Sequence, residues 1–102
     1  MLMITQRIEE EVLMNLPSHK GFLIGYIIQD DEESPVFSDV DVAKRYAHSN
    51  NILAKLGYSI ITRLKIAPTT TDYSSEEVYS RGDVLSEEEY LHYDKQRNTW
   101  KK

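Results

Sequence analysis

An apolar run near the start of the chain constrains the fold more than any other feature. From Phe22 to Ile28 every residue except Gly25 is apolar or aromatic. A run of this kind, without alternation of polar and apolar residues, is typical of a strand whose two faces are both buried. We therefore expect a strand over about residues 22–29 that lies inside a sheet.

A second strand, of a different kind, is expected over about residues 58–67. Apolar side chains alternate there with residues such as Arg63 and Lys65, so one face should meet the core while much of the other meets water. Between the two strands, residues 39–56 show helical spacing, and Gly57 is a suitable terminator. A connection of this length permits a parallel crossover, and antiparallel pairing is the alternative.

One local signature occurs three times along the chain. A serine is followed three residues later by an acid, with hydrophobic residues on either side, at Ser38, Ser74 and Ser86. The serine can cap a helix, and the acid favours the first turn. The second and third copies predict two C-terminal helices, over about residues 75–81 and 87–97.

The N-terminal segment fits two structures. The spacing of Ile4, Ile8 and Val12 favours a helix over residues 5–15. The alternative is a strand over residues 1–8. Because two strands seldom make a stable sheet, a third strand should come either from this segment or from a second copy of the chain, which would make the protein a homodimer.

Together these elements predict a small α+β fold, with residues 1–102 as a single domain. A short sheet is covered by the long helix, and the two C-terminal helices pack against another surface. The chain has no cysteine, which excludes disulfides and thiolate chemistry. No apolar run approaches the length of a spanning helix or forms a signal segment, so we expect a cytoplasmic protein without membrane contact.

A basic stripe is the first candidate binding site. Residues 44–65 carry five bases and no acid, whereas the whole chain has a net charge of -5. On a helix, four of the polar residues in this segment would share one outer face, and two more follow on the second strand. The stripe comprises Lys44, His48, Asn51, Lys55, Arg63 and Lys65. It could bind nucleic acid or an acidic protein surface, and the alternative is an ordinary solvated helix face.

An acidic and aromatic face is the second candidate. Its members are Asp30, Asp31, Glu32, Glu33, Tyr90, Tyr93 and Trp100. Carboxylates can occupy a basic site on a partner, and tyrosine and tryptophan supply many anchor contacts in interfaces. The alternative is that the acids line an exposed loop and the rings dock the C-terminal helices.

No catalytic or cofactor motif is present. The three histidines are scattered, and no phosphate-binding loop, dinucleotide fingerprint or nucleophile elbow occurs. We therefore expect no cofactor and no metal. The sequence favours a non-enzymatic interaction or regulatory protein that binds another protein, such as an inhibitor with an acidic face. The alternatives are a nucleic-acid-associated protein that uses the stripe from Lys44 to Lys65, and a small enzyme centred on His48.

Overall fold

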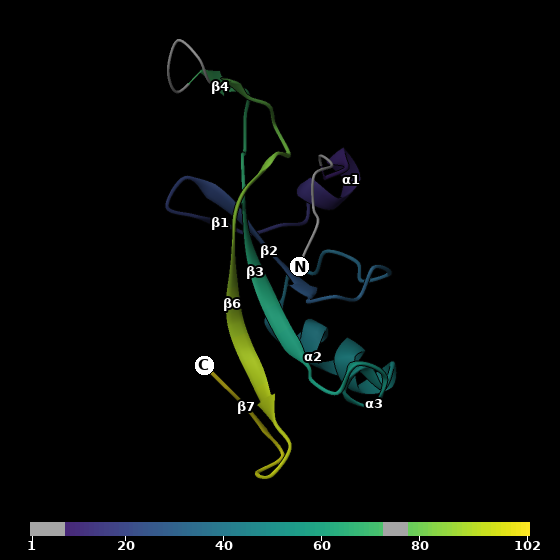
Figure 1. Cartoon of the computed structure of the whole chain (residues 1–102). Helices are drawn as coiled ribbons and strands as arrows, with labels where there is room; N and C mark the ends of the chain where they lie inside the picture. The colour runs from purple at the N-terminus through teal and green to yellow at the C-terminus, as the bar shows by residue number, and fades with distance from the viewer. Residues whose placement is uncertain (1–7, 73–77) are drawn as a thin grey trace.

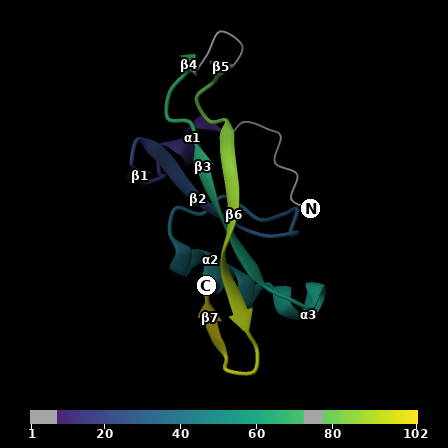
Figure 2. The ribbon, with the colours of Figure 1, turned by 60° about the vertical axis from the view of Figure 1, so that its left-hand side comes forward.

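A five-stranded antiparallel sheet forms the centre of the fold. The computed structural model describes residues 8–72 and 78–102, and within them the strand order is β1-β2-β3-β6-β7. Figures 1 and 2 show a long, strongly curved sheet with helices packed near its ends. The strands are β1 (Ser18–His19), β2 (Phe22–Ile28), β3 (Ile60–Ile66), β6 (Val84–Asp94) and β7 (Thr99–Lys101), and a separate two-stranded sheet joins β4 (Thr71–Asp72) to β5 (Val78–Tyr79).

Both strands expected in the first two thirds of the chain are confirmed. β2 and β3 pair antiparallel, from Leu23 opposite Ile66 to Ile28 opposite Ile61, so the parallel crossover is wrong. β2 is buried along most of its length, as its apolar run predicts. The simple alternation expected for β3 is interrupted, because the neighbouring Ile61 and Thr62 are both buried where side chains cover both faces of the strand.

The C-terminal segment supplies β6, which pairs with the second edge of β3, and Ser18–His19 supply β1, which pairs with β2. The two predicted C-terminal helices are wrong. Residues 87–97 lie in β6 and in the turn that leads to β7, residues 78–81 lie in β5 and the turn after it, and residues 73–77 are outside the described residues. The cap signature is local and worth only about 1 kcal/mol. β3 contains the buried Ile61 and Leu64, and its second edge needs a partner strand. Pairing of β6 with this edge satisfies a whole row of backbone N–H and C=O groups, which outweighs the cap signature.

The predicted long helix is two helices, α2 (Val40–Ser49) and α3 (Ile52–Leu56). The chain bends at Asn51, whose φ is +54°, and α3 ends at Gly57, whose φ of +85° fits the predicted terminator. The cap of α2 is Asp39 in place of Ser38, because the Asp39 carboxylate accepts the Asp41 N–H at 2.8 Å. Among the described residues, none of the helices is long and apolar enough to cross a membrane.

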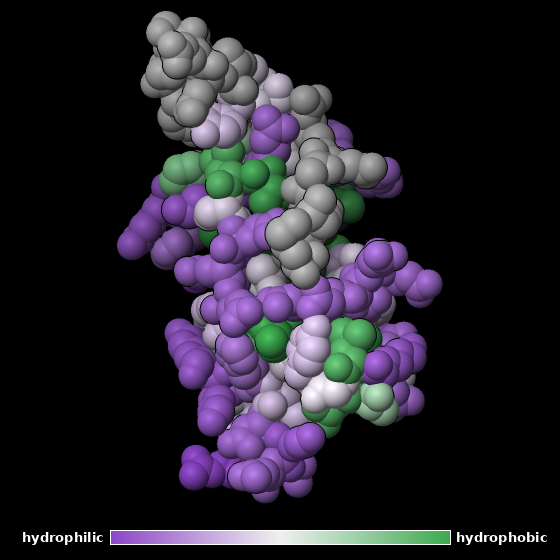
Figure 3. Space-filling view, viewed as in Figure 1, coloured by the Kyte–Doolittle hydropathy of each residue, from purple (hydrophilic) through white to green (hydrophobic). Residues whose placement is uncertain are grey.

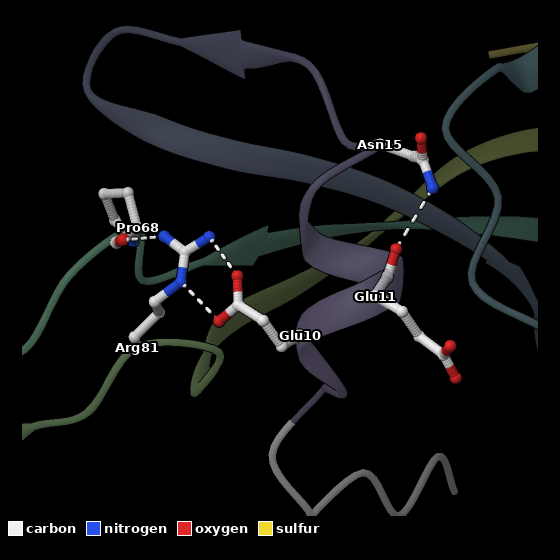
Figure 4. Close-up of polar contacts among 5 residues, drawn as sticks. All are labelled: Glu10, Glu11, Asn15, Pro68 and Arg81. Carbon is white, nitrogen blue, oxygen red and sulfur yellow. Dashed lines mark hydrogen bonds and ion pairs between the residues drawn. The ribbon is translucent and has the colours of Figure 1, made fainter.

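A short helix, α1 (Glu10–Leu13), stands where a longer N-terminal helix was expected. Residues 1–7 are outside the described residues, so the choice between helix and strand there is not decided. Arg81 holds α1 to the segment after β3. Its Nε and Nη2 donate to the two carboxylate oxygens of Glu10, each at 2.8 Å, and its Nη1 donates to the Pro68 carbonyl (Figure 4).

Two apolar clusters lie on opposite faces of the sheet, because successive strand residues point to opposite sides. The first holds α1 on the sheet through Leu13, Leu16, Leu23, Ile27, Leu64 and Ile66. The second holds α2 and α3 through Ile28, Ala43, Ala47, Ile52, Ile61 and Leu91. In the space-filling view, hydrophilic side chains cover much of the surface over β6 and β7 (Figure 3).

Candidate functional site

The β6–β7 hairpin places an aromatic cluster against α2. Tyr93 of β6 is opposite Trp100 of β7 in the strand register, and their ring centroids are 5.2 Å apart. The His48 ring lies 5.1 Å from that of Tyr93 and 5.8 Å from that of Trp100, both edge to face. The Trp100 indole N–H donates to Nε2 of His48 at 3.3 Å. These tilted contacts suit the ring quadrupoles and hold the hairpin on the helix.

Tyr90 extends the aromatic surface along β6. The register with β3 jumps from Leu91 to Glu89, so Tyr90 is the extra residue of a β-bulge, a feature that redirects a side chain. Its ring lies 5.7 Å from that of Tyr26. The Arg63 guanidinium and the Lys102 ammonium lie 5.0 and 4.9 Å from its centroid, which are cation–π distances.

Three consecutive glutamates precede Tyr90 on the same strand and are all exposed. Glu88 forms an ion pair with Arg63, and a Glu89 oxygen lies 3.3 Å from Nε2 of His92. Burial raises the pKa of Glu87 above the usual value, because partial removal from water disfavours the ionised form. Along β6, Glu88 therefore shares a face with Arg63 and Tyr90, whereas Glu87 and Glu89 point to the opposite face, opposite Leu64 and Thr62 in the register.

We call this region the β6–β7 surface. It is partly exposed, since Tyr90, Tyr93 and Trp100 are each half-buried, and the ring contacts described above fix its geometry. It consists of Glu87, Glu88, Glu89, Tyr90, Tyr93 and Trp100. Three of these residues, the aromatic ones, belong to the acidic and aromatic face expected from the sequence.

The four acids of that expected face lie elsewhere, in the loop after β2. Asp30 accepts a hydrogen bond from the Tyr58 hydroxyl, which holds the pKa of Asp30 below its usual value and raises that of Tyr58. Asp31 accepts from the Tyr46 hydroxyl at 3.2 Å. Glu32 and Glu33 are exposed. The contacts of Asp30 and Asp31 thus attach the loop to α2 and to the residues just before β3, away from Tyr93 and Trp100.

The members of the expected basic stripe are spread over several elements of the fold. Its members lie on α2, at the bend before α3, on α3 and on β3, and several have partners from outside the segment. Lys44 lies 3.4 Å from Asp41, Arg63 pairs with Glu88, and the Lys65 ammonium lies 4.8 Å from the Phe22 ring centroid. His48 is engaged with Trp100 as described above, and Asn51 and Lys55 are exposed. Residues 44–65 contain no acid, but Asp41 and Glu88 from neighbouring parts of the fold lie beside two of their basic side chains.

Two shallow hollows are found on the described surface. One, of about 380 Å³, lies beside α1 and is lined by Glu11, Val12, Asn15, Leu16, Val36 and Ser38. The other, of about 210 Å³, is lined by Gln29, Thr62, Glu87, Glu88 and Glu89. Neither includes His48, the residue around which a small enzyme was considered. Within the described residues, no group of three histidines or acids is placed to hold a metal ion.

Sequence reasoning missed the partners that shape this surface. The sequence places His48 in a basic stripe and assigns Tyr26 and Lys102 to no site. The alternation of apolar and polar residues around Leu91 and Tyr93 was a signal for a strand, but its pairing with β7 is known only from the register.

Comparison with protein-family models, curated proteins and solved structures gives no match to this chain. Its function has to be inferred from the geometry of its own residues.

Proposed function

We propose that the protein is a non-enzymatic interaction protein that binds another protein through the β6–β7 surface. The observation that carries this proposal is the position of three half-exposed aromatic rings on two neighbouring strands, with Glu88 on the same face of β6 as Tyr90 and with Glu87 and Glu89 on the opposite face of that strand. An inhibitor that covers a basic site on its target is one form of this function.

The aromatic half of the surface suits binding because its rings are already ordered. Tyrosine and tryptophan are enriched among residues that dominate binding energy. Trp100 is fixed by its hydrogen bond to His48 and by its contact with Tyr93. Ordering of these side chains on binding therefore costs little, which leaves more of the contact energy for affinity.

The charged half of the surface decides the kind of partner. The carboxylates of Glu87 and Glu89, next to the Glu88–Arg63 ion pair, stand where a nucleic acid would bring phosphates, and like charges repel. A protein with basic residues fits this charge. Because Lys44 and Arg63 already lie beside acids of the same chain, the basic stripe supports the nucleic-acid alternative less well.

The test is capture of a partner from the native cell by the immobilised full chain. We expect Tyr93→Ala and Trp100→Ala each to weaken the captured interaction by about tenfold or more, as anchors in an interface do. Tyr58→Ala is the matched control, because it removes an exposed ring (39% exposed) outside the β6–β7 surface.

All three variants should first be shown to fold by circular dichroism. The proposal fails if no specific partner is captured. It also fails if the folded Tyr93 and Trp100 variants bind the partner as tightly as the Tyr58 control does.

A further inference from the structure

One edge of β6 is open over most of its length. β3 pairs with the other edge, whereas β7 covers this one only at His92, Tyr93 and Asp94. Among residues 8–72 and 78–102, no strand pairs with it between Val84 and Leu91. Such an edge presents a row of N–H and C=O groups to which a further extended chain can bind.

The hydrogen bonds of β3 show which β6 groups point outward. Gln29 donates its N–H to the Ile60 carbonyl at 2.9 Å, so Ile60 faces β2. In an antiparallel sheet, alternate residues turn their backbone groups to opposite neighbours. Arg63 and Lys65 therefore turn theirs toward β6.

The register then fixes the orientation of the β6 backbone. Arg63 lies opposite Glu88 and Lys65 lies opposite Ser86, so the backbone groups of Glu88 and Ser86 face inward. Glu87 lies between them and Glu89 follows Glu88 in the same regular stretch, so the backbone groups of Glu87 and Glu89 face the open edge.

The negative charge along this edge of β6 favours an added strand with positive side chains. Glu87, Glu88 and Glu89 would lie beside the added strand, and opposite charges across a strand pair are favourable whereas like charges are not. A second copy of β6 would bring three more glutamates to the same place. A strand with lysine or arginine side chains is therefore the occupant that fits.

The hollow beside this edge can hold a cationic side chain. Its volume is about 210 Å³, and it is lined by polar residues, among them Thr62, Glu87 and Glu89. Thr62 is buried and donates its hydroxyl to Oε1 of Gln29 at 3.2 Å. Burial raises the pKa of Glu87, and a lysine or arginine head group placed here would offset that cost.

We propose that the partner binds as an extended, basic peptide segment that adds a strand to β6 along Leu85–Leu91. This inference rests on the proposed function and specifies how the partner is held. The backbone of β6 supplies the hydrogen bonds, and the glutamates supply the selectivity for lysine or arginine.

The test uses a synthetic peptide of eight alternating lysine and valine residues, with an acidic peptide of alternating glutamate and valine as its matched control. We expect the full chain to bind the basic peptide and not the acidic one. Glu87→Pro removes one outward N–H at an edge position, where proline is tolerated, and it should weaken binding by about tenfold.

Because Glu87→Pro also removes a charge, Glu87→Gln is its control. The glutamine variant retains the N–H and should lose less affinity than the proline variant. In the unaltered protein, the basic peptide should slow amide exchange at Glu87 and Glu89, which keeps the proposal testable if Glu87→Pro does not fold.

Equal binding by the folded proline variant and the unaltered protein would overturn the inference. So would unchanged exchange at the two outward amides when the peptide is bound, or full protection of them in the free protein, since another segment would then hold the edge. A captured partner that depends on Trp100 but leaves these amides unprotected would remove the strand-addition mode and leave the proposed function intact.

Discussion

Gly25, in the middle of β2, gives a direct test of how the sheet is packed. A β-carbon at this position would lie 2.6 Å from Cγ1 of Val36. Val36 has little freedom to move, because the next residue, Phe37, exchanges two backbone hydrogen bonds with Tyr26, at 2.8 and 2.7 Å. Overpacking of this kind destabilises a protein by about 1–3 kcal/mol. Replacing glycine by alanine also restricts the unfolded chain, which stabilises the folded state by about 0.4–1 kcal/mol. We expect Gly25→Ala to lower the free energy of unfolding by about 1–2 kcal/mol.

The same clash predicts a coupling that can be measured. Other neighbours of the added carbon, Cδ1 of Ile66 at 3.5 Å and Cδ1 of Leu16 at 3.7 Å, are at ordinary contact distances. In a Val36→Ala background, Gly25→Ala should therefore be neutral or stabilising. Urea denaturation of the four proteins should give a favourable coupling of about 1–3 kcal/mol. Additive effects, or an unchanged stability of Gly25→Ala alone, would refute this description of the packing.

Three further predictions concern single side chains. The hydrogen bonds from Arg81 hold the pKa of Glu10 below its usual value. The stabilisation by this ion pair is therefore fully present above the unfolded-state pKa of Glu10 and is lost as the pH falls through the folded-state pKa. In urea titrations, the stability difference between the unaltered protein and Glu10→Gln should shrink on acidification. Burial raises the pKa of Glu87, so its contribution to stability should fall as the pH rises from the unfolded-state pKa through the raised folded-state pKa, and Glu87→Gln should flatten that part of the pH profile. The buried Ser59 hydroxyl has no hydrogen-bond partner among the described residues, so Ser59→Ala should raise the thermal midpoint, by a gain of about 1 kcal/mol; a lower midpoint would contradict this.

The parts of the fold that the sequence predicts are those set by local burial. The apolar run of β2 needs two covered faces, and it has them. Gly57 ends α3 because the position requires a positive φ. The bend between α2 and α3 has a local cause as well, because asparagine tolerates the left-handed conformation that Asn51 adopts. The pair Asn50–Asn51 therefore indicated a break in the helix, although the apolar spacing across it is helical.

The C-terminal third could not be predicted in the same way because its structure is decided by the rest of the sheet. Ser86 and Glu89 form a plausible helix start when considered alone. The segment is instead the strand β6, because it pairs with the backbone groups along the second edge of β3. The candidate site shows the same dependence. Trp100 meets His48 only because β7 folds back on β6 and α2 packs beneath the hairpin, a relation between residues 52 positions apart that no local pattern contains.

The most direct test of the β6–β7 surface is a footprint of the captured partner on the full chain. Amide exchange should be compared residue by residue in the free and bound protein. We predict that protection appears along residues 85–93 and around Trp100, with Glu87 and Glu89 among the protected amides. Protection confined to α2 and α3, around Lys44 and Lys55, would contradict the account and assign binding to the basic residues of the helices.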